Sequence, residues 1–233
     1  MANAYYESGD SRARKVNELF ASIAPRYDRI NDIQSFGMHH RWKRRLVGMA
    51  ALRAGDRALD VCCGTGDIAE LLAATGARTT GLDFTAEMLE VARRRNGAIE
   101  YVQGDAMNLP FEDESFDALT VGFGLRNLAE WKTGLEEMHR VAKPGGRLVV
   151  LDFGRPDSGL WRALYFAYLR MIVPVYGKLF CGNWSAYAYI LESLKNYPAQ
   201  RGVEQGMTEL NCKDVRVVNF FGGAMSINHG VKA

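Results

Sequence analysis

The sequence predicts a single α/β domain built on a doubly wound, mostly parallel sheet that ends in an antiparallel hairpin. Strand-like runs alternate with helical runs from Arg57 to Phe153, as expected of such a sheet. A glycine-rich turn separates the first strand from the first helix of this alternation, and a Gly-Gly pair separates two strand-like runs near the end. With 233 residues the chain is long enough for one full α/β domain, but hardly for two independent ones. We therefore treat residues 1–233 as one domain.

The glycine turn lies between a short buried strand and a helix. Arg57-Ala-Leu-Asp-Val61 is the strand, Gly64-Thr-Gly66 permits the tight turn, and Ile68-Ala-Glu-Leu-Leu72 begins the helix. The next strand, Arg78-Thr-Thr-Gly-Leu82, brings Asp83 to its carboxyl end. Ligands bind at that end of a parallel sheet, where a carboxylate can hold both hydroxyls of a ribose.

The remaining elements follow in the same alternation. The pattern predicts a helix at about 85–95, strands at 99–102 and 115–122, a helix through 135–142 and a strand at 147–153. Lys143-Pro-Gly-Gly146 is expected to end the second of these helices. The segments 214–220 and 224–229 flank Gly222-Gly223 and predict an antiparallel hairpin at the edge of the sheet.

Two segments lie outside this regular core. Residues 12–50 are helical by pattern, because Val16, Leu19, Phe20 and Ile23 recur at the three- and four-residue spacing of one helix face. Residues 155–198 are rich in large apolar side chains but lack the roughly 20 uninterrupted apolar residues of a membrane-spanning helix. An apolar substrate pocket, a membrane-contacting lid and ordinary core packing all remain open for this segment.

Composition excludes several classes of function. The formal net charge of +2 gives no reason to expect a nucleic-acid partner. Cysteines 62, 63, 181 and 212 form no CxxC pair, so we expect neither a metal site nor a disulfide framework. Residues 1–10 lack a basic stretch followed by an apolar core, which argues against a secretory signal and favours a reducing, cytoplasmic setting.

The ligand of the glycine turn is the first chemical question. Gly64-Thr-Gly-Asp-Ile-Ala69 also satisfies the dinucleotide pattern, with alanine in the third position. Asp67, however, begins the helix where a pyrophosphate would otherwise meet free N–H groups, and its carboxylate repels phosphate. A ligand with an ammonium or a sulfonium and no phosphates, such as S-adenosylmethionine, suits it better. The alternative without a ligand is that Asp67 only caps its helix and the glycines only turn the chain.

The motifs along the chain also carry a family resemblance. From about Val16 to Lys232, the sequence resembles Rossmann-like class I S-adenosylmethionine-dependent methyltransferases, and within them the group that C-methylates polyprenylated quinols in menaquinone and ubiquinone biosynthesis. The pieces that carry the resemblance are Tyr27-Asp28 with Asn31, Ser35-Phe-Gly37, His39, Trp42-Lys-Arg44, Asp60-Val, Gly64-Thr-Gly-Asp67, Gly81-Leu-Asp83, Met88-Leu89, Leu109-Pro-Phe111, Phe116-Asp117, Phe123-Gly-Leu-Arg-Asn127, Arg140-Val with Lys143-Pro-Gly-Gly-Arg147, and Tyr187, Tyr189, Glu192-Ser193 and Pro198.

The resemblance implies a site in two parts. The cofactor-binding residues that it implies are Asp60, Gly64, Thr65, Gly66, Asp83, Asp105, Ala106 and Gly122. We expect Thr65 to meet the methionine portion, Asp83 the ribose and Asp105 the adenine amine. The implied catalytic residues are Arg126, Asn127, Tyr27 and His39. For His39, a helix-surface histidine beside His40 and Arg41 is the competing interpretation.

The implied acceptor is demethylmenaquinol, and the benzoquinol intermediate of ubiquinone biosynthesis or another small molecule is the alternative. Residues 12–50 are then expected to form an N-terminal helical lid, and residues 155–198 an apolar substrate lid. Because such a quinol lives in the bilayer, we expect peripheral contact with the inner face of the membrane through residues 160–184 and Trp42-Lys-Arg-Arg45. An exposed apolar face would equally serve a homodimer.

Overall fold

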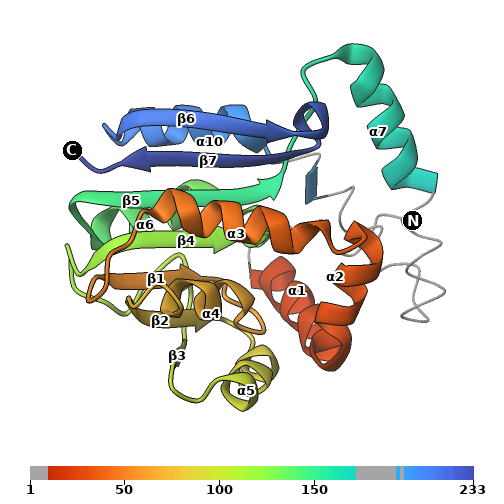
Figure 1. The fold of residues 1–233 in the computed structure, drawn as a ribbon. Helices are drawn as coiled ribbons and strands as arrows, with labels where there is room; N and C mark the ends of the chain where they lie inside the picture. The colour runs from red at the N-terminus through yellow and green to blue at the C-terminus, as the bar shows by residue number, and fades with distance from the viewer. Residues whose placement is uncertain (1–9, 172–192, 195–196) are drawn as a thin grey trace.

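The computed structural model describes residues 10–171, 193–194 and 197–233, and centres on one mixed sheet (Figure 1). The strands lie in the order β3-β2-β1-β4-β5-β7-β6. Their bounds are β1 (Arg57–Val61), β2 (Arg78–Asp83), β3 (Glu100–Gln103), β4 (Phe116–Gly122), β5 (Ala142–Phe153), β6 (Lys213–Phe220) and β7 (Met225–Val231). β1 to β5 pair in parallel, whereas β7 is antiparallel to both β5 and β6. The predicted fold class and its hairpin are confirmed.

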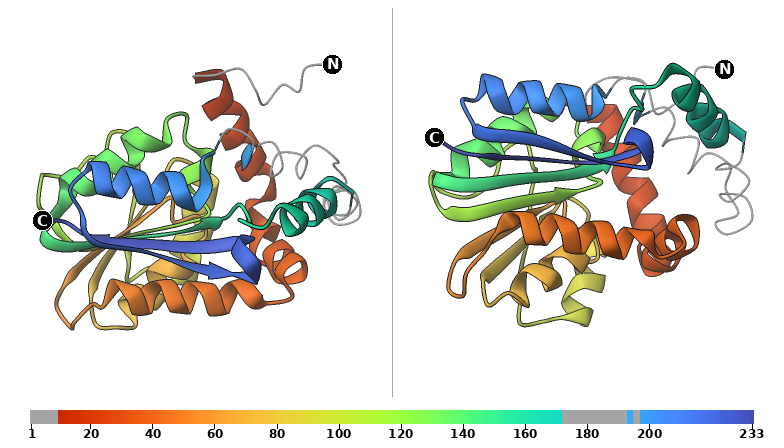
Figure 2. Two further views of the ribbon diagram at one scale, coloured as in Figure 1. Left: turned by 90° about the horizontal axis from the view of Figure 1, so that it is seen from above. Right: turned by 45° about the horizontal axis from the view of Figure 1, so that its top comes forward.

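Helices cover both faces of the sheet, which makes three layers (Figure 2). One face carries α3 (Met38–Ala50) and α4 (Asp67–Ala73), and the other carries α6 (Trp131–Val141) and α10 (Ala199–Glu209). The remaining helical elements are α1 (Asp10–Ile23), η1 (Ala24–Arg26), α2 (Tyr27–Ser35), α5 (Ala86–Arg95), η2 (Leu125–Asn127), α7 (Gly159–Met171) and η3 (Phe221–Gly223). No helix in the described part of the chain is long and apolar enough to cross a membrane.

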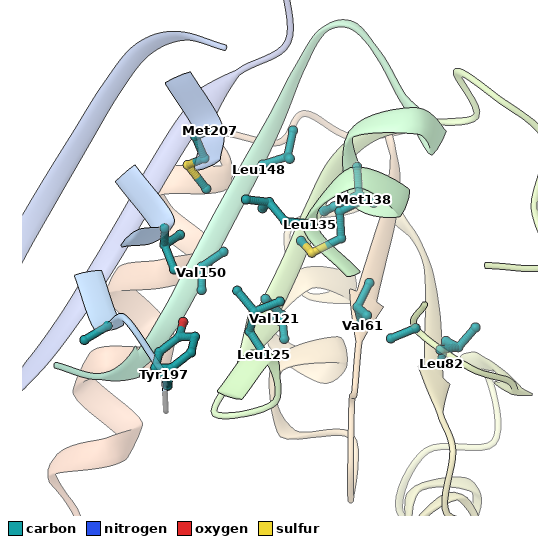
Figure 3. Close-up of a cluster of buried hydrophobic side chains, with 14 of the residues drawn as sticks. Val61, Leu82, Val121, Leu125, Leu135, Met138, Leu148, Val150, Tyr197 and Met207 are labelled. Atoms are coloured by element: carbon teal, nitrogen blue, oxygen red, sulfur yellow. The ribbon is translucent and has the colours of Figure 1, made fainter. Parts of the chain in front are cut away.

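The central strands are buried on both sides, which is why their sequences read as continuous apolar runs. Val61, Val121 and Val150 point from three neighbouring strands toward Leu135 and Met138 on α6 (Figure 3). Burial of each such side chain contributes about 1.5–3 kcal/mol to folding. The sheet is therefore a rigid platform for the loops at its carboxyl edge.

β5 begins earlier than the predicted strand at residues 147–153, although α6 ends before Lys143 as predicted. Lys143-Pro-Gly-Gly146 follows α6 directly as the first part of β5, and does not lie outside the sheet. The Gly145 N–H donates to the Lys232 carbonyl, and the Lys232 N–H donates to the Gly146 carbonyl. Lys232 thus satisfies backbone groups in this first part of β5.

α1, α2 and α7 lie beyond the carboxyl ends of β4 and β5, whereas α3 runs back along the sheet (Figure 1). The helical pattern of residues 12–50 corresponds to α1, α2 and α3 in series, with η1 between the first two. Within residues 155–198, the structure describes residues 155–171, which include α7, and residues 193–194 and 197–198. Phe180, Trp184, Tyr187 and Tyr189 lie outside the described residues, so the predictions made for them stay predictions.

Candidate active site

A cavity of about 620 Å³ opens at the carboxyl ends of β1, β2 and β4. We call it the polar cavity. Its wall includes five of the residues predicted to bind a cofactor, namely Gly64, Asp83, Asp105, Ala106 and Gly122. The glycine turn and the acidic residue after the second strand therefore meet where the sequence placed them.

Asp83 is held in position by its neighbours. Its Oδ2 accepts the Gly64 N–H at 2.8 Å, and its Oδ1 accepts the Thr85 N–H at 2.9 Å. Burial raises the pKa of this carboxyl, against the two backbone hydrogen bonds that favour the charged form. Each oxygen retains a second lone pair, so the group can accept hydrogen bonds from a ligand diol while staying anchored.

Asp105 and Ala106 follow β3 on the other side of the cavity. Asp105 Oδ1 accepts the Met107 N–H at 2.8 Å, which closes a short turn and fixes the carboxylate. Ala106 is buried. Asp105 and Ala106 thus lie in the cavity wall after β3, one with a polar side chain and the other with a small one.

The glycines of the site are required for different reasons. Gly66 has a φ of 88°, and a β-carbon there would lie 2.5 Å from the Tyr101 hydroxyl. Gly122 lines the cavity, but a β-carbon on it would collide with the Ile68 side chain on α4. Glycine at 122 is thus explained by packing against a helix as well as by access to the cavity.

Three predicted cofactor-binding residues, Asp60, Thr65 and Gly66, lie outside the cavity wall. Asp60 is fully buried, and its Oδ1 accepts the Thr120 hydroxyl at 2.8 Å. The Thr65 hydroxyl donates to Asp28 Oδ1 on α2 at 2.6 Å. Both side chains are therefore engaged with the protein, so they act on the cavity through the backbone and the elements that they hold.

Asp67 belongs to a cluster of charges that sequence reasoning missed. Lys43 Nζ lies 2.7 Å from Asp67 Oδ2, and Arg95 Nη1 lies 2.6 Å from Asp67 Oδ1. Burial opposes ionisation of Asp67, but these two cations outweigh it and lower its pKa to about 2. The prediction that a free Asp67 carboxylate repels phosphate is wrong in its reason, because the charge is already neutralised. Nothing in the local sequence points to either partner.

Arg95 extends the cluster to the N-terminal segment. Its Nη1 also lies 2.9 Å from Asp28 Oδ2 on α2, and its Nη2 lies 3.1 Å from Glu70 Oε2 on α4. Its guanidinium further donates to the Thr65 carbonyl at 3.3 Å. We call these residues the α2 clamp, after the helix that they fasten; its members are Asp28, Lys43, Thr65, Asp67, Glu70 and Arg95.

Phosphate is disfavoured for another reason, which lies in the cavity wall itself. Among the described residues, no lysine, arginine or histidine lines the polar cavity, whereas the carboxylates Asp83 and Asp105 do. A pyrophosphate would find no cation there, but a ligand with a net positive charge would be attracted. S-adenosylmethionine carries a sulfonium, an ammonium and one carboxylate, and its adenosine suits Asp83 and Asp105. The residues present fit this cofactor.

A second cavity of about 540 Å³ adjoins the first. We call it the aromatic cavity. It is walled by α1, α2, α3 and α7, and it shares Phe20, Tyr27 and Phe123 with the polar cavity. The two cavities therefore adjoin at these three side chains.

The predicted catalytic residues divide between the cavities. Tyr27 lines both, Asn127 lines the polar cavity, and His39 and Arg126 line the aromatic cavity. Arg126 is buried, with Nη1 2.7 Å from Asp152 Oδ1 and 2.6 Å from the Phe123 carbonyl. Asn127 Nδ2 donates to the same carbonyl at 3.1 Å. His39 is only 3% exposed, so the interpretation as a surface histidine is wrong.

The sheet and the polar cavity, with Asp83 at the end of β2, together define a class I S-adenosylmethionine-dependent methyltransferase. Solved structures agree at the level of the fold: a methyltransferase from Thermotoga maritima described as a possible histamine N-methyltransferase is 20% identical, with a TM-score of 0.63 over 92% of this chain and 100% of that one. The chain belongs to the ubiE/COQ5 methyltransferase family, whose sequence profile matches residues 8–232. Demethylmenaquinone methyltransferases of Staphylococcus aureus strains MRSA252 and JH9 are each 39% identical over 96% of both chains.

Proposed function

We propose that this enzyme transfers a methyl group to a ring carbon of a polyprenylated quinol, demethylmenaquinol above all. The observation that carries the proposal is the pair of cavities joined at Phe20, Tyr27 and Phe123. One cavity offers carboxylates for a cationic nucleoside, and the other offers an aromatic wall for an apolar ring. The names of the S. aureus relatives support the naphthoquinol as the acceptor.

Methyl transfer depends mainly on the alignment of the ring carbon with the methyl donor. S-adenosylmethionine supplies an electrophilic methyl group, which the ring carbon must approach in line with the bond that breaks. Fixing two reactants in such a geometry can supply about 7–11 kcal/mol of the barrier. The acceptor must also be the electron-rich quinol, because a quinone carbon is a poor nucleophile. A wall shared by both cavities is suited to hold ring and methyl donor in contact.

The mouth of the aromatic cavity is apolar as well. Phe36, Leu164 and Phe221 line the cavity and are 83%, 55% and 55% exposed. Solvent-exposed side chains of this size are typical of surfaces that meet a partner or a membrane. We propose that they meet the bilayer, from which the prenyl tail enters, at the inner face of the cytoplasmic membrane.

Part of the predicted membrane contact is wrong. Trp42 and Lys43 are buried, and Lys43 is held by Asp67. Arg44 and Arg45 are exposed and stay candidates for contact with anionic lipid. Sequence alone could not separate these four neighbours, because the face that a helix buries depends on the sheet beneath it.

The decisive assay supplies S-adenosylmethionine with reduced demethylmenaquinol, and in parallel with the benzoquinol precursor of ubiquinone. We expect methylation of the naphthoquinol with the higher kcat/KM, identified by mass spectrometry of the product. Oxidised demethylmenaquinone should not react. Turnover of the benzoquinol alone would replace the proposed acceptor, and turnover of neither quinol would refute the proposal.

Membrane contact is tested by co-sedimentation with vesicles that contain anionic lipid. We expect the wild-type chain to sediment with them, and the double variant Phe36→Glu, Leu164→Glu to stay in solution. Lys213→Glu, at the far end of β6, is the control for added negative charge and should bind as the wild type does. If the wild-type chain is instead a homodimer in solution that the double variant dissociates, the apolar mouth is a subunit interface and the proposal of membrane contact fails.

A further inference from the structure

Apart from Arg126, which is paired with Asp152, two side chains that line the aromatic cavity each have a buried polar atom with no hydrogen-bond partner in the described part of the chain. These atoms are Nδ1 of His39, on α3, and Nε2 of Gln34, on α2. Buried polar atoms are almost always paired, because an unpaired one costs about 1–3 kcal/mol. Two such atoms on one cavity wall point to a polar group of the ligand that this cavity receives.

Asp32 determines which nitrogen of His39 carries the proton. His39 Nε2 lies 2.9 Å from Asp32 Oδ1. The hydrogen bond from His39 lowers the pKa of Asp32, so this carboxylate is ionised and can only accept. Nε2 therefore donates, and Nδ1 is left with a free lone pair. Burial lowers the pKa of His39, which keeps the ring neutral near pH 7.

The two unpaired atoms are complementary. Nδ1 of His39 is an acceptor, whereas the Nε2 amide of Gln34 is a donor. A hydroxyl group both donates and accepts, so it has the chemistry to pair with either atom. Carboxylates, ammonium groups and carbonyls would each satisfy only one of the two.

We propose that Gln34 and His39 bind one hydroxyl of the quinol ring, and that His39 Nδ1 takes its proton during methyl transfer. The inference rests on the proposed function and names the residues that read the reduced state of the acceptor. Nδ1 of His39 and Nε2 of Gln34 are both buried. Hydrogen bonds between an enzyme and its substrate commonly reach their final geometry only when the substrate binds.

Methyl transfer is accompanied by movement of the quinol's hydroxyl proton. The O–H bond of the quinol breaks, its proton passes to Nδ1, and its electron pair moves into the ring as the new C–CH3 bond forms. The S–CH3 bond breaks at the same time, and its electron pair stays on sulfur. The methylated carbon then loses its hydrogen as a proton to water, and the electron pair of that C–H bond restores the aromatic ring as the ring oxygen takes back the proton held on Nδ1. A quinone has no such hydroxyl proton, so it cannot bind the pair in this way.

The test compares two adjacent histidines. His40 Nε2 lies 2.7 Å from the same Asp32 oxygen, but His40 is exposed and does not line the cavity. We expect His39→Gln to lower kcat by about a hundredfold or more, the usual contribution of a proton acceptor, and to remove the acid limb of the pH–rate profile. His40→Gln should change kcat by less than about twofold and should keep the acid limb of the pH–rate profile. The affinity for S-adenosylmethionine, measured by calorimetry, should stay unchanged in both variants.

Chemical rescue distinguishes a role of His39 in proton transfer from a purely structural role. Added imidazole should restore part of the activity of His39→Ala and none of that of Asp83→Ala. Gln34→Leu should raise KM for the quinol about tenfold, as the loss of one hydrogen bond predicts, with an unchanged acid limb. The proposal is overturned if His39→Gln keeps its acid limb, or if His40→Gln loses as much activity as His39→Gln does.

A chelator provides a further check. The ligand atoms of Asp32, His39 and His40 all lie within 4.8 Å of one another, so the same group could hold a metal ion. We expect activity to survive dialysis against a chelator, and its loss would overturn the assignment of His39 as the proton acceptor. Failure of the proposed function would look different, since the wild-type chain itself would then leave demethylmenaquinol unmethylated.

Discussion

Asp83 accepts two backbone hydrogen bonds with the same two oxygens that we expect to meet the ribose. Its bonds to the Gly64 and Thr85 N–H groups hold the glycine turn and the start of α5 in place. Substitution by alanine should therefore remove the diol acceptors and loosen the turn as well. We expect Asp83→Ala to weaken the binding of S-adenosylmethionine about ten- to a hundredfold, since each hydrogen bond to a charged group contributes about 1.5–3 kcal/mol.

Calorimetric titration measures this loss, with Asp113→Ala as the control. Asp113 is an exposed carboxylate paired with Arg140, away from the cavity. An Asp83→Ala variant that binds the cofactor as tightly as the Asp113→Ala variant would show that the ribose is held elsewhere. Titration of the wild-type chain with NAD should give no heat of binding.

Arg126 has a structural role as well as a predicted catalytic one. It is paired with Asp152, whose side chain is only 3% exposed. Removing one partner of a buried ion pair typically costs about 3–5 kcal/mol, because the other charge is left buried. We expect Arg126→Ala to lower the free energy of unfolding by this amount, measured in urea, and Asp152→Asn in the same background to recover part of it. An Arg126→Ala variant of wild-type stability would contradict this account.

Local patterns brought Gly64 and Asp83 to the polar cavity but did not predict the contacts of the α2 clamp. Gly64 and Asp83 follow strands, so the sheet topology alone brings them to one edge. Arg95 ends α5, and its meeting with Asp28 on α2 depends on how two separate helices pack. Its sequence neighbours suggest only an exposed basic helix end. Contacts of this kind are decided by tertiary packing, which one sequence does not reveal.

At the scale of elements, α2 is the part of the fold on which both cavities depend. It carries Tyr27 of the shared wall, and it is fastened to α4 and α5 by the α2 clamp. Replacing Arg95 by glutamine removes the cation that joins Asp28, Asp67 and Glu70. We expect KM for S-adenosylmethionine to rise about fivefold to thirtyfold, equivalent to roughly 1–2 kcal/mol of positioning energy.

Arg94 offers the matched control for this variant. It precedes Arg95 on the same helix, is 71% exposed, and has one ion pair, with Glu90 at 4.0 Å. Arg94→Gln should leave KM unchanged, as is usual for surface pairs. Hydrogen exchange should also quicken in residues 27–35 of the Arg95→Gln variant alone. Equal effects of both substitutions would mean that only the net charge of α5 matters.

For the whole molecule, the clearest expectation concerns the dependence of stability on pH. Asp60 is fully buried, and burial raises its pKa to about 7, above the ordinary value of 3.8 that applies when the chain unfolds. The folded chain therefore holds this proton between about pH 4 and 7, while the unfolded chain releases it. Its contribution to stability is present below pH 4 and is lost as the pH rises through 7.

Asp60→Asn removes this titrating proton, so the free energy of unfolding of the variant should fall less steeply as the pH rises. Unfolding in urea at pH 5 and pH 8 measures it, and we expect the wild-type chain to lose about 1–4 kcal/mol more than the variant does between these two values, at about 1.4 kcal/mol per unit of pKa. The Thr120 hydroxyl retains an acceptor in the variant, so the packing of β1 against β4 should survive. Parallel declines in the two proteins would show that Asp60 is ionised when folded.

The shared wall of Phe20, Tyr27 and Phe123 also has a consequence for inhibition. A single molecule that links adenosine to an apolar ring by a short tether would fill both cavities at once. Once its first half is bound, the second half is present at an effective concentration of about millimolar or higher. Two weak fragments joined across these three aromatic side chains would therefore make a strong bisubstrate inhibitor, whose ring half would distinguish this enzyme from methyltransferases that share only its nucleoside cradle.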